Sequence, residues 1–508
     1  MTTLQLQGAP LLVVGAGLMG AGIAQVAAQA GHAVQLFDAR EGAAAAAKAK
    51  LAGTFDGLIN KGRLDATAAQ AALSRIEPIT TLAQAAGAAL VVEAIVEDLA
   101  AKRALFQQLE NLLGTQAVLA TNTSSISVTA IANGLQRPGR LVGMHFFNPV
   151  PLMKLVEVVS GLQTDPAVAA AIFELSRLWG KAPVHAKSTP GFIVNRIARP
   201  YYAETLALLQ EQAAPPEVLD ACLKAAGFRM GPCELMDLIG HDTNFAVTQS
   251  VFEANFFDKR FVPSGVQREM VAGGLLGRKS GRGFYRYADG KGGAPAPASE
   301  SFPALGAAGS VTVHGGDPAA DRLEQVATAA LAQHGCSVGR EPASPWTGLA
   351  IGRARLMLTD GRTAQQCATD LGVADVAVFD RLPSAPAGAA LAYALAPRAG
   401  EAWRAQAAAW LASLGHLPLQ VADAPGLVVA RTLAMLVNEA ADAVLQGVCS
   451  PEGADAAMKL GVNYPAGPFE WLAGWSVEGV AGVIAALDRE YRGERYRLSP
   501  WLRRRLQA

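Results

Sequence analysis

The sequence has no excess of either charge. Its 508 residues contain 43 lysines and arginines and 43 aspartates and glutamates, so the formal net charge is zero. A chain without a global field has no general attraction for nucleic acid or an anionic membrane, so any anionic ligand must be held by local groups. No stretch approaches the roughly 18 uninterrupted apolar residues of a membrane-spanning helix. We therefore expect a cytoplasmic protein that binds neither nucleic acid nor membrane.

Cysteine is also scarce, and its placement argues against a metal site. None of the five cysteines forms a Cys-x-x-Cys pair or has a histidine at ligand spacing; they are Cys222, Cys233, Cys336, Cys367 and Cys449. We expect a reducing compartment and no metal. Hydrophobic residues, in contrast, make up 51% of the chain, as in globular proteins rich in buried helix and parallel sheet. At roughly 150 residues per domain, the length suggests three or four domains.

A glycine-rich motif follows the first apolar segment. The segment at 10–14 runs into Gly15-Ala-Gly-Leu-Met-Gly20, which is followed by an alanine-rich helix and a second apolar strand at 33–37. This order predicts a Rossmann-type dinucleotide-binding unit rather than a glycine-rich turn without a ligand. Gly15 allows the tight turn, Gly17 lets the backbone approach a pyrophosphate, and Gly20 allows close helix packing. The predicted cofactor-binding residues of the motif are Gly15, Gly17, Leu18, Met19 and Gly20.

Asp38 ends the second strand of this unit. A carboxylate at this position is expected to accept hydrogen bonds from the adenosine ribose hydroxyls and to repel a 2′-phosphate. The sequence therefore predicts NAD rather than NADP, although Arg40, two residues further on, argues slightly the other way.

A long helical stretch interrupts the dinucleotide-binding pattern. Residues 41–77 read as helix broken at Gly62, which predicts a helical hairpin at about 42–77. Its cations can reach a phosphate-bearing substrate, or they can simply form a solvated face; they are Lys48, Lys50, Lys61 and Arg63.

The next two strands also deliver polar residues. The strand at 88–95 leads to Glu97 and Lys102, and the segment at 117–125, which reads as another strand, delivers Asn122 and Ser124. Ligands bind beyond the carboxyl ends of strands in open α/β sheets, so these residues are candidates for a binding site. The competing interpretation of Ser124 is a helix cap.

One histidine and one glutamate lie on the strands that follow. The segments around His145 and Glu157 are apolar and are separated by a turn rich in proline. A carboxylate bound to one ring nitrogen sets the imidazole tautomer and raises its basicity, as a general base near neutral pH requires. A buried histidine beside an edge-strand charge is the alternative. Asn195 lies just inside what we expect to be a long helix, from which its amide can face the same cleft.

Several of these motifs together resemble the 3-hydroxyacyl-CoA dehydrogenase family over residues 8 to about 287. They are the glycine motif, Asn122-Thr-Ser-Ser125, His145-Phe-Phe-Asn-Pro149, Glu157, Pro190-Gly-Phe-Ile-Val-Asn-Arg196 and Gly277-Arg-Lys-Ser-Gly-Arg-Gly-Phe284.

The resemblance implies roles for the candidate residues. His145 and Glu157 would form the catalytic pair, and Ser124 and Asn195 would bind the hydroxyl and thioester region of the substrate. Glu97 and Lys102 would lie near NAD together with Asn122, and the hairpin bearing Lys61 would contact coenzyme A. The family acts on the L-(S) enantiomer.

The second half contains a degenerate α/β unit and a repeat. Strands are expected at 310–314, 355–359 and 375–379, without a glycine motif, so we expect no dinucleotide there. From Ala402 the sequence repeats, with Pro425-Gly-Leu-Val-Val-Ala-Arg431 aligned to the segment at 190–196. Ala430 stands in place of Asn195 and no histidine motif precedes it, so this copy is predicted to be catalytically silent. We expect it to pack on the first copy as an intramolecular pseudo-dimer, with further homo-oligomerisation left open.

The predicted fold is an α/β Rossmann-type domain with an all-α C-terminal domain, followed by a degenerate α/β unit and a second all-α domain. The expected boundaries are 1–186, 187–287, a linker at 288–309, 310–400 and 401–508.

The predicted function is NAD-dependent oxidation of a short or dicarboxylyl (S)-3-hydroxyacyl-CoA. Examples are 3-hydroxybutyryl-CoA or 3-hydroxyadipyl-CoA in fatty-acid or phenylacetate catabolism. Alternatives are a crystallin-like sugar-acid dehydrogenase of the L-gulonate type and a non-catalytic NAD-binding structural or sensor protein. No hydratase or isomerase segment is apparent.

Overall fold

The chain forms two compact units. The computed structural model describes residues 4–288, 291–297, 302, 305, 310–332, 335–382 and 388–507. Unit 1 comprises residues 1–196 and 443–463, and unit 2 comprises 197–442 and 464–508. Among the described residues, no helix combines the length and apolar character that crossing a bilayer requires.

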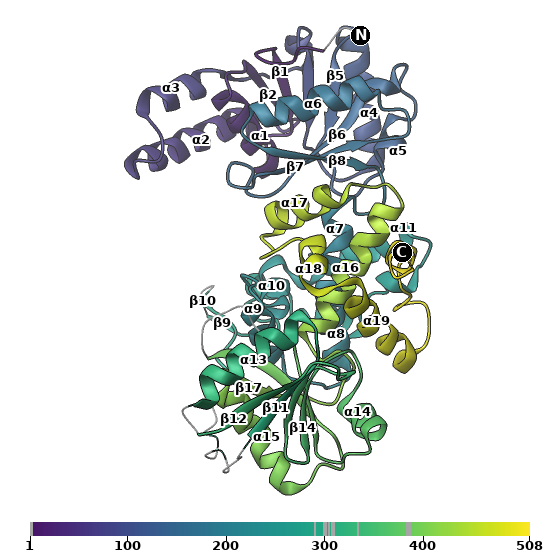
Figure 1. Cartoon of the computed structure of the whole chain (residues 1–508). Helices are drawn as coiled ribbons and strands as arrows, with labels where there is room; N and C mark the ends of the chain where they lie inside the picture. Colours follow the sequence, from purple (N-terminus) through teal and green to yellow (C-terminus); the bar gives the residue numbers. More distant parts are fainter. Residues whose placement is uncertain are drawn as a thin grey trace. The chain divides into compact units, whose positions relative to one another are not determined.

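An eight-stranded sheet forms the centre of unit 1 (Figure 1). Its order is β3-β2-β1-β4-β5-β6-β7-β8, and every neighbouring pair is parallel except β6–β7. The central strands are buried along their length, as apolar runs in a doubly covered sheet require. The strands are β1 (Leu11–Val14), β2 (Val34–Phe37), β3 (Ile76–Pro78), β4 (Leu90–Glu93), β5 (Val118–Thr121), β6 (Leu141–Phe146), β7 (Leu155–Ser160) and β8 (Ala182–Lys187).

Most helices of unit 1 connect successive strands, which gives the β-α-β order of a Rossmann fold. Side chains of Asp98, Ser127 and Asp165 accept the first free amides of α4, α5 and α6 and so define where these helices begin. The helices are α1 (Leu18–Gln29), α2 (Ala43–Asn60), α3 (Ala66–Ser74), α4 (Leu99–Leu112), α5 (Val128–Ala132) and α6 (Pro166–Leu178).

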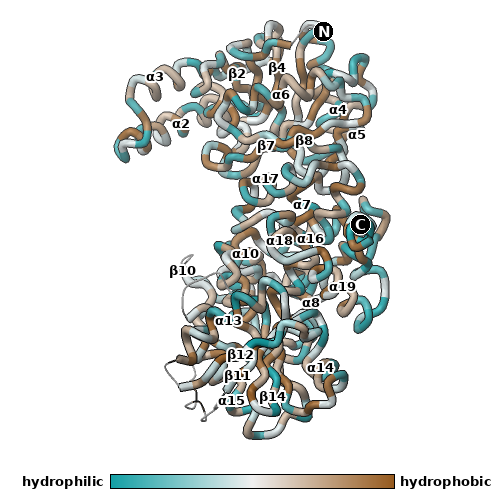
Figure 2. The backbone as a smooth tube through the Cα atoms, viewed as in Figure 1, coloured by the Kyte–Doolittle hydropathy of each residue, from teal (hydrophilic) through white to brown (hydrophobic). Residues whose placement is uncertain are grey.

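The helices α2 and α3 form a hairpin that projects from the sheet (Figure 1). Gly62 lies between them in the left-handed region, with φ +64, and Asp65 caps α3. The turn, which contains Lys61 and Arg63, is hydrophilic (Figure 2).

A helix from far along the chain completes unit 1. This helix, α17 (Pro451–Val462), packs against β7 and β8, although by sequence it belongs to the second helical copy. The backbone amide of Lys187 in β8 donates to the carbonyl of Val448, which precedes α17, at 3.0 Å.

Unit 2 contains helices of both copies and a second sheet. In the first copy, the short helix α7 (Val194–Ile197), most of which belongs to unit 1, is separated at Ala198 from α8, whereas the counterpart segment of the second copy is one continuous helix, α16. Pro200 at the start of α8 explains this difference, because proline is favoured in a first helical turn and disrupts a helix interior. The remaining bounds are α8 (Arg199–Gln210), α9 (Pro216–Ala225), α10 (Pro232–Ile239), α11 (His241–Ala254), α12 (Gly265–Ala272), α16 (Val429–Leu445), α18 (Pro468–Trp475), α19 (Val477–Tyr491) and α20 (Pro500–Arg505).

The second sheet has seven strands in the order β12-β11-β13-β14-β15-β16-β17. Its last strands repeat the pattern of unit 1, because β15–β16 is antiparallel and β16–β17 is parallel, like β6–β7 and β7–β8. Its elements are β11 (Ser310–His314), α13 (Pro318–Leu331), β12 (Ser337–Glu341), β13 (Gly348–Ile351), β14 (Ala354–Leu358), α14 (Ala364–Leu371), β15 (Val376–Phe379), β16 (Ala389–Leu395), α15 (Glu401–Ser413) and β17 (His416–Gln420).

About half of the expected linker at 288–309 lies outside the described residues. Its beginning forms a short antiparallel pair, β9 (Tyr287–Ala288) with β10 (Lys291–Gly292).

Candidate functional site

A buried His–Glu pair lies on the antiparallel strands β6 and β7. His145 and Glu157 are register partners, and Nδ1 of His145 lies 2.6 Å from Oε2 of Glu157. Both residues are nearly inaccessible, with 6% and 0% exposure. A carboxylate has no proton to donate, so this contact requires the imidazole proton to be on Nδ1. The lone pair is therefore on Nε2, on the far side of the ring from Glu157.

The second oxygen of Glu157 is also occupied. Oε1 accepts the backbone amides of Ile193 and Val194, both at 3.0 Å. Two aromatic rings enclose the imidazole: those of Phe147 and Phe192, with centroids 4.5 and 5.9 Å from that of His145. The carboxylate is thus anchored by backbone donors while it orients the base, an arrangement that holds the tautomer and ring in place.

A second carboxylate organises the carboxyl ends of β4 and β5. Oε1 of Glu97 accepts hydrogen bonds from the hydroxyl of Thr123 at 2.6 Å and from the amide of Ser124 at 3.0 Å. Burial alone would raise the pKa of Glu97, but the hydrogen bond from Thr123 and the charge of Lys102 outweigh it and hold the pKa below its usual value.

Lys102 lies inside the protein rather than at the surface of the cleft. Its side chain is 1% exposed, and Nζ contacts Glu93 at 2.6 Å and Glu97 at 3.2 Å. In this structure Lys102 therefore orients Glu97. The sequence analysis did not identify Glu93 and Thr123 as members of this site. Glu93 could have been found from its position at the end of the apolar strand β4, because a buried carboxylate needs a partner.

The polar residues after β5 connect to the His–Glu pair. Oδ1 of Asn122 accepts the backbone amide of Phe146, the residue after His145, at 2.9 Å. Nδ2 of Asn195 donates to the carbonyl of Ser124 at 3.4 Å. The structure thus brings four predicted residues, Asn122, Ser124, His145 and Asn195, to one edge of the sheet.

Two expectations about these residues need correction or refinement. Ser127 rather than Ser124 caps α5, which leaves the Ser124 side chain without a capping role. Asn195 does not lie in a long helix: it lies in the four-residue helix α7, because Pro200 starts a new helix shortly after it.

The glycine motif forms the turn between β1 and α1. A Cβ atom at Gly15, which has φ +102, would lie 2.4 Å from the carbonyl oxygen of Ala94, and one at Gly20 would lie 1.8 Å from that of Gly15. A Cβ atom at Gly17 would meet nothing within 4 Å, so the backbone is open there to a ligand. Leu18 is 69% exposed at the start of α1, and Met19 follows it half-buried.

Asp38 is tied to the same turn. Its Oδ2 accepts the amide of Ala16 at 2.8 Å, and its Oδ1 accepts the amide and side chain of Arg40, both at 3.0 Å. The hydrogen bond from Arg40 lowers the pKa of Asp38 to about 2, so the carboxylate is ionised at neutral pH.

Lys61 is not brought to the His–Glu pair. It ends α2 at the exposed turn of the projecting hairpin (Figure 1).

The second sheet carries a degenerate counterpart of the His–Glu pair. Asp380 follows β15 and its amide donates to the carbonyl of Ala392 at 2.9 Å. These residues stand 235 positions after His145 and Glu157, the same interval that separates Ala430 from Asn195. Asp380 accepts the amides of residues 428, 429 and 430 at 2.6 to 2.9 Å. The repeat therefore begins well before Ala402. The constant interval of 235 residues between equivalent positions could have shown this from the sequence.

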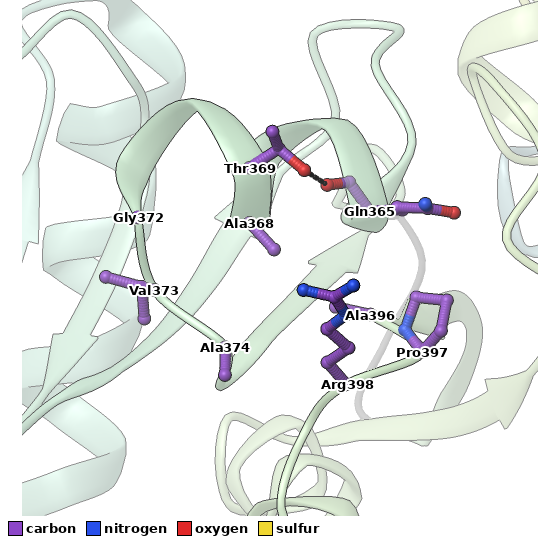
Figure 3. A pocket seen from close by; sticks show the side chains of 9 residues that line it. All are labelled: Gln365, Ala368, Thr369, Gly372, Val373, Ala374, Ala396, Pro397 and Arg398. Carbon is purple, nitrogen blue, oxygen red and sulfur yellow. Dashed lines mark hydrogen bonds between the residues drawn. The ribbon is translucent and has the colours of Figure 1, made fainter.

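A cavity of about 590 Å³ in unit 2 does not carry a comparable set of groups (Figure 3). It lies at the amino end of β15, between α14 and the loop at 396–398, and Arg398 is its one charged lining residue among the described residues. The hydrogen bond drawn in Figure 3, from Thr369 to the carbonyl of Gln365, lies within α14.

Comparison with known proteins extends these observations. A profile described as "3-hydroxyacyl-CoA dehydrogenase, NAD binding domain" matches residues 11–189. The profile of the family's C-terminal domain matches twice, at 191–287 and 426–508. A third, described as "3-hydroxybutyryl-CoA dehydrogenase reduced Rossmann-fold domain", matches 356–425.

Similar proteins include both full-length and shorter relatives. The chain is 43% identical over 494 residues to 3-hydroxyadipyl-CoA dehydrogenase of Escherichia coli, covering 97% of this chain and 96% of that protein. The crystal structure of 3-hydroxybutyryl-CoA dehydrogenase from E. coli matches with a TM-score of 0.88 and 42% identity over 99% of both chains. That of (S)-3-hydroxybutyryl-CoA dehydrogenase from Ralstonia eutropha matches with a TM-score of 0.54 and 41% identity, covering 55% of this chain and 99% of that one.

A Rossmann-type sheet with an NAD-binding profile defines an NAD-dependent oxidoreductase. The chain belongs to the 3-hydroxyacyl-CoA dehydrogenase family. The predicted fold class, the enzyme class and NAD as cofactor are thereby confirmed.

Proposed function

We propose that the protein oxidises the 3-hydroxyl of an (S)-3-hydroxyacyl-CoA to the 3-oxo group, with His145 as general base. Nε2 of His145 takes the hydroxyl proton as C3 loses a hydride. NAD, when bound, supplies the nicotinamide that accepts this hydride. Glu157 stabilises the imidazolium that forms, because its carboxylate lies against Nδ1.

One observation carries the proposal: the 2.6 Å contact between His145 and Glu157, in which both oxygens of a fully buried carboxylate are occupied. Desolvating a carboxylate is costly, so a carboxylate retained there needs strong partners. The backbone amides and the imidazole provide them, and the arrangement prepares Nε2 to accept a proton.

The neighbouring polar residues receive positioning and binding roles. We assign Ser124 and Asn195 to the hydroxyl and thioester region of the substrate, which their place beside the pair supports. Gly15, Gly17, Leu18, Met19 and Gly20 would hold the pyrophosphate, and Asp38 the ribose. Asn122, Glu97 and Lys102 would shape the nicotinamide end, and Lys61 would meet the anionic part of coenzyme A.

For the acyl group we propose a short chain, neutral or dicarboxylic. The names of the full-length relatives, 3-hydroxyadipyl-CoA and 3-hydroxybutyryl-CoA dehydrogenase, support this choice and a role in phenylacetate or fatty-acid catabolism. The test measures NADH formation with 3-hydroxybutyryl-CoA, 3-hydroxyadipyl-CoA and a long-chain analogue, with L-gulonate as a substrate lacking coenzyme A. Oxidation of L-gulonate alone would contradict the proposal.

We further propose that the second helical copy acts as an intramolecular pseudo-dimer partner. Arg495 contacts Glu204 at 2.8 Å and Arg260 contacts Glu439 at 3.2 Å. The members of each pair lie in different copies, and Arg495 and Glu439 each stand 235 positions after Arg260 and Glu204. Reciprocal contacts between equivalent residues are those of a two-fold interface.

Truncation after Tyr287 tests this role, because it removes the second copy and exposes the helix faces that the copy covers. We expect an aggregating or dimeric product in light scattering. A monodisperse, fully active monomer would contradict the pseudo-dimer. A cytoplasmic location is also proposed; the five cysteines, which form no disulfide, support it.

A further inference from the structure

One glycine of the second, silent copy lies close to residues that contact or adjoin the His145–Glu157 pair. Gly461 lies near the end of α17, the helix that packs on β7 and β8. A Cβ atom at Gly461 would lie 2.6 Å from Cδ2 of Leu155, 3.1 Å from Cγ2 of Val194 and 3.6 Å from Cε1 of Phe147. The first distance is closer than carbon atoms approach without a shift, so a methyl group at this position would displace the end of the Leu155 side chain, which is fully buried.

Each of these three residues contacts, or lies next to, a member of the His145–Glu157 pair. Val194 donates its amide to Glu157 at 3.0 Å. The ring of Phe147 lies 4.5 Å from that of His145. Leu155 begins β7, two residues before Glu157 on the same face of the strand. Gly461 is therefore separated from each catalytic side chain by a single residue.

Backbone conformation does not explain this glycine. Gly461 lies within a helix and is not among the residues with positive φ. Glycine inside a helix costs about 0.5–1 kcal/mol relative to alanine. Close approach of α17 to Leu155 and Val194 is the feature that requires it.

The segment before α17 is also bonded to the same region. Nη1 of Arg196 donates to Oε1 of Gln446 at 2.7 Å, and the amide of Lys187 donates to the carbonyl of Val448 at 3.0 Å. These contacts hold the segment at 446–462 against the turn that donates to Glu157.

We propose that α17, through Gly461, is a positioning element of the catalytic site: the half of the chain without a base sets the geometry of the base in the other half. This inference rests on the proposed function for its kinetic readout. Structurally it concerns only the contacts of α17 with β7 and with the rings beside His145.

The repeat offers a matched control. Ala226 is the C-cap residue that follows α9 of the first copy, 235 positions before Gly461. It lines a cavity of about 110 Å³ beside Asp380, where there is no base to misplace. Ala226→Leu adds to the counterpart helix a side chain that this cavity can accept.

The experiment compares Gly461→Ala and Gly461→Leu with Ala226→Leu in the full chain. Misplacement of reacting groups by about 1 Å can cost on the order of 100-fold in rate. We expect kcat to fall about 10-fold in Gly461→Ala and about 100-fold in Gly461→Leu. The KM for NAD should stay unchanged, and the pH profile of kcat should shift because the His145–Glu157 contact changes. Ala226→Leu should retain kcat.

A compensating variant separates positioning from damage to the fold. Leu155→Val removes the Cδ2 atom that a methyl group at 461 would meet, so Gly461→Ala/Leu155→Val should recover most of the lost kcat. If Gly461→Leu does not fold, the comparison of Gly461→Ala with Gly461→Ala/Leu155→Val tests the positioning role. Unchanged kcat and pH profile in Gly461→Ala, or no recovery in the double variant, would overturn the proposal.

A spectroscopic readout is independent of turnover. We expect the proton between Nδ1 of His145 and Glu157 to give a downfield NMR signal that His145→Gln removes and that Gly461→Ala shifts. A wild-type protein inactive on every acyl-CoA would refute the proposed function, whereas an unshifted signal in Gly461→Ala would refute the positioning role.

Discussion

The strand pairs β6–β7 and β15–β16 have the same topology but different chemistry. On the first, Glu157 of β7 accepts the amides of the following helical turn and also holds His145. On the second, Asp380 stands at the histidine position and itself accepts the amides of the turn, while Ala392 stands in place of the glutamate. One carboxylate, from either strand of the pair, is enough to anchor the helical turn. A general base requires a second residue, and only the first strand pair has it, in His145.

Asp380 is a structural carboxylate in an unfavourable environment. Burial raises its pKa above the usual value, and the hydrogen bonds from Val429 and Ala430 oppose this only in part. The comparison predicts that substitutions at the two positions separate catalysis from stability.

The largest expected effect is on turnover. His145→Gln removes the base, so we expect kcat to fall about 10² to 10⁴-fold with NAD binding retained, the usual contribution of general base catalysis. Stopped-flow NADH absorbance and NADH fluorescence titration measure the two quantities. Asp380→Asn is the matched variant and should leave kcat within a few-fold. Equal loss of turnover in both variants would break the comparison.

The next effect is on stability, and we expect it to be similar in the two helical copies. Glu204 and Glu439 are equivalent, buried and paired with arginines. Replacing either by glutamine removes one carboxylate from a buried arginine that keeps a second, Glu211 for Arg431 and Asp442 for Arg260. Breaking a buried ion pair outright costs about 3–5 kcal/mol, so we expect each variant to lose at most this amount. Denaturant unfolding should show similar losses for both variants.

A more exposed pair provides the control for these two variants. Asp258 contacts Arg497, whose side chain is 43% exposed. Asp258→Asn should cost no more than about 1 kcal/mol. If only Glu204→Gln destabilises the protein, the two copies are not structurally equivalent.

A smaller effect depends on pH. Burial raises the pKa of Asp220 from 3.8 to about 6, despite the hydrogen bonds from Cys233 and Tyr285. The unfolded chain releases this proton first, so the contribution of Asp220 to stability falls as pH rises from about 4 to about 6. The total loss is on the order of 3 kcal/mol.

Unfolding measured across this pH range checks the sign. Asp220→Asn should make the free energy of unfolding less dependent on pH. Asp455→Asn, at the equivalent and less buried position, should change the dependence less. A wild-type protein whose stability rises between pH 4 and 6 through Asp220 would contradict the assignment.

The smallest expected effect is on cofactor selection. Asp38→Asn removes the charge that would repel a 2′-phosphate, so we expect the preference for NAD over NADP to fall roughly 10-fold, about 1.4 kcal/mol. The ratio of kcat/KM for the two cofactors measures it. No change in this ratio would show that Asp38 only braces Ala16 and Arg40.

Local patterns predicted much of the architecture. The glycine motif, the strand ending at Asp38 and the hairpin broken at Gly62 depend on residues close together in sequence, because turn glycines and strand ends are set by local sterics. The contact of His145 with Glu157 was foreseeable for the same reason, since a short turn joins the two strands.

Other features could not be read locally. The sequence did not show that the packing of α4 buries Lys102 between Glu93 and Glu97, and its place near the cofactor stays a prediction. The sequence also predicted one long helix around Asn195. Proline is accepted in the first turn of a helix and breaks its interior, so the effect of Pro200 depends on where the helix begins, and the sequence did not show this.

The sequence by itself determined the family, NAD as cofactor and the repeat, since these are recorded in motifs and their spacing. Only the tertiary structure decided that Asp380 took over the anchoring role of Glu157, and that α17 of the silent copy packs beneath the catalytic strands. Contacts between segments some 300 residues apart depend on the shape of the packed surfaces, and no local pattern encodes that shape.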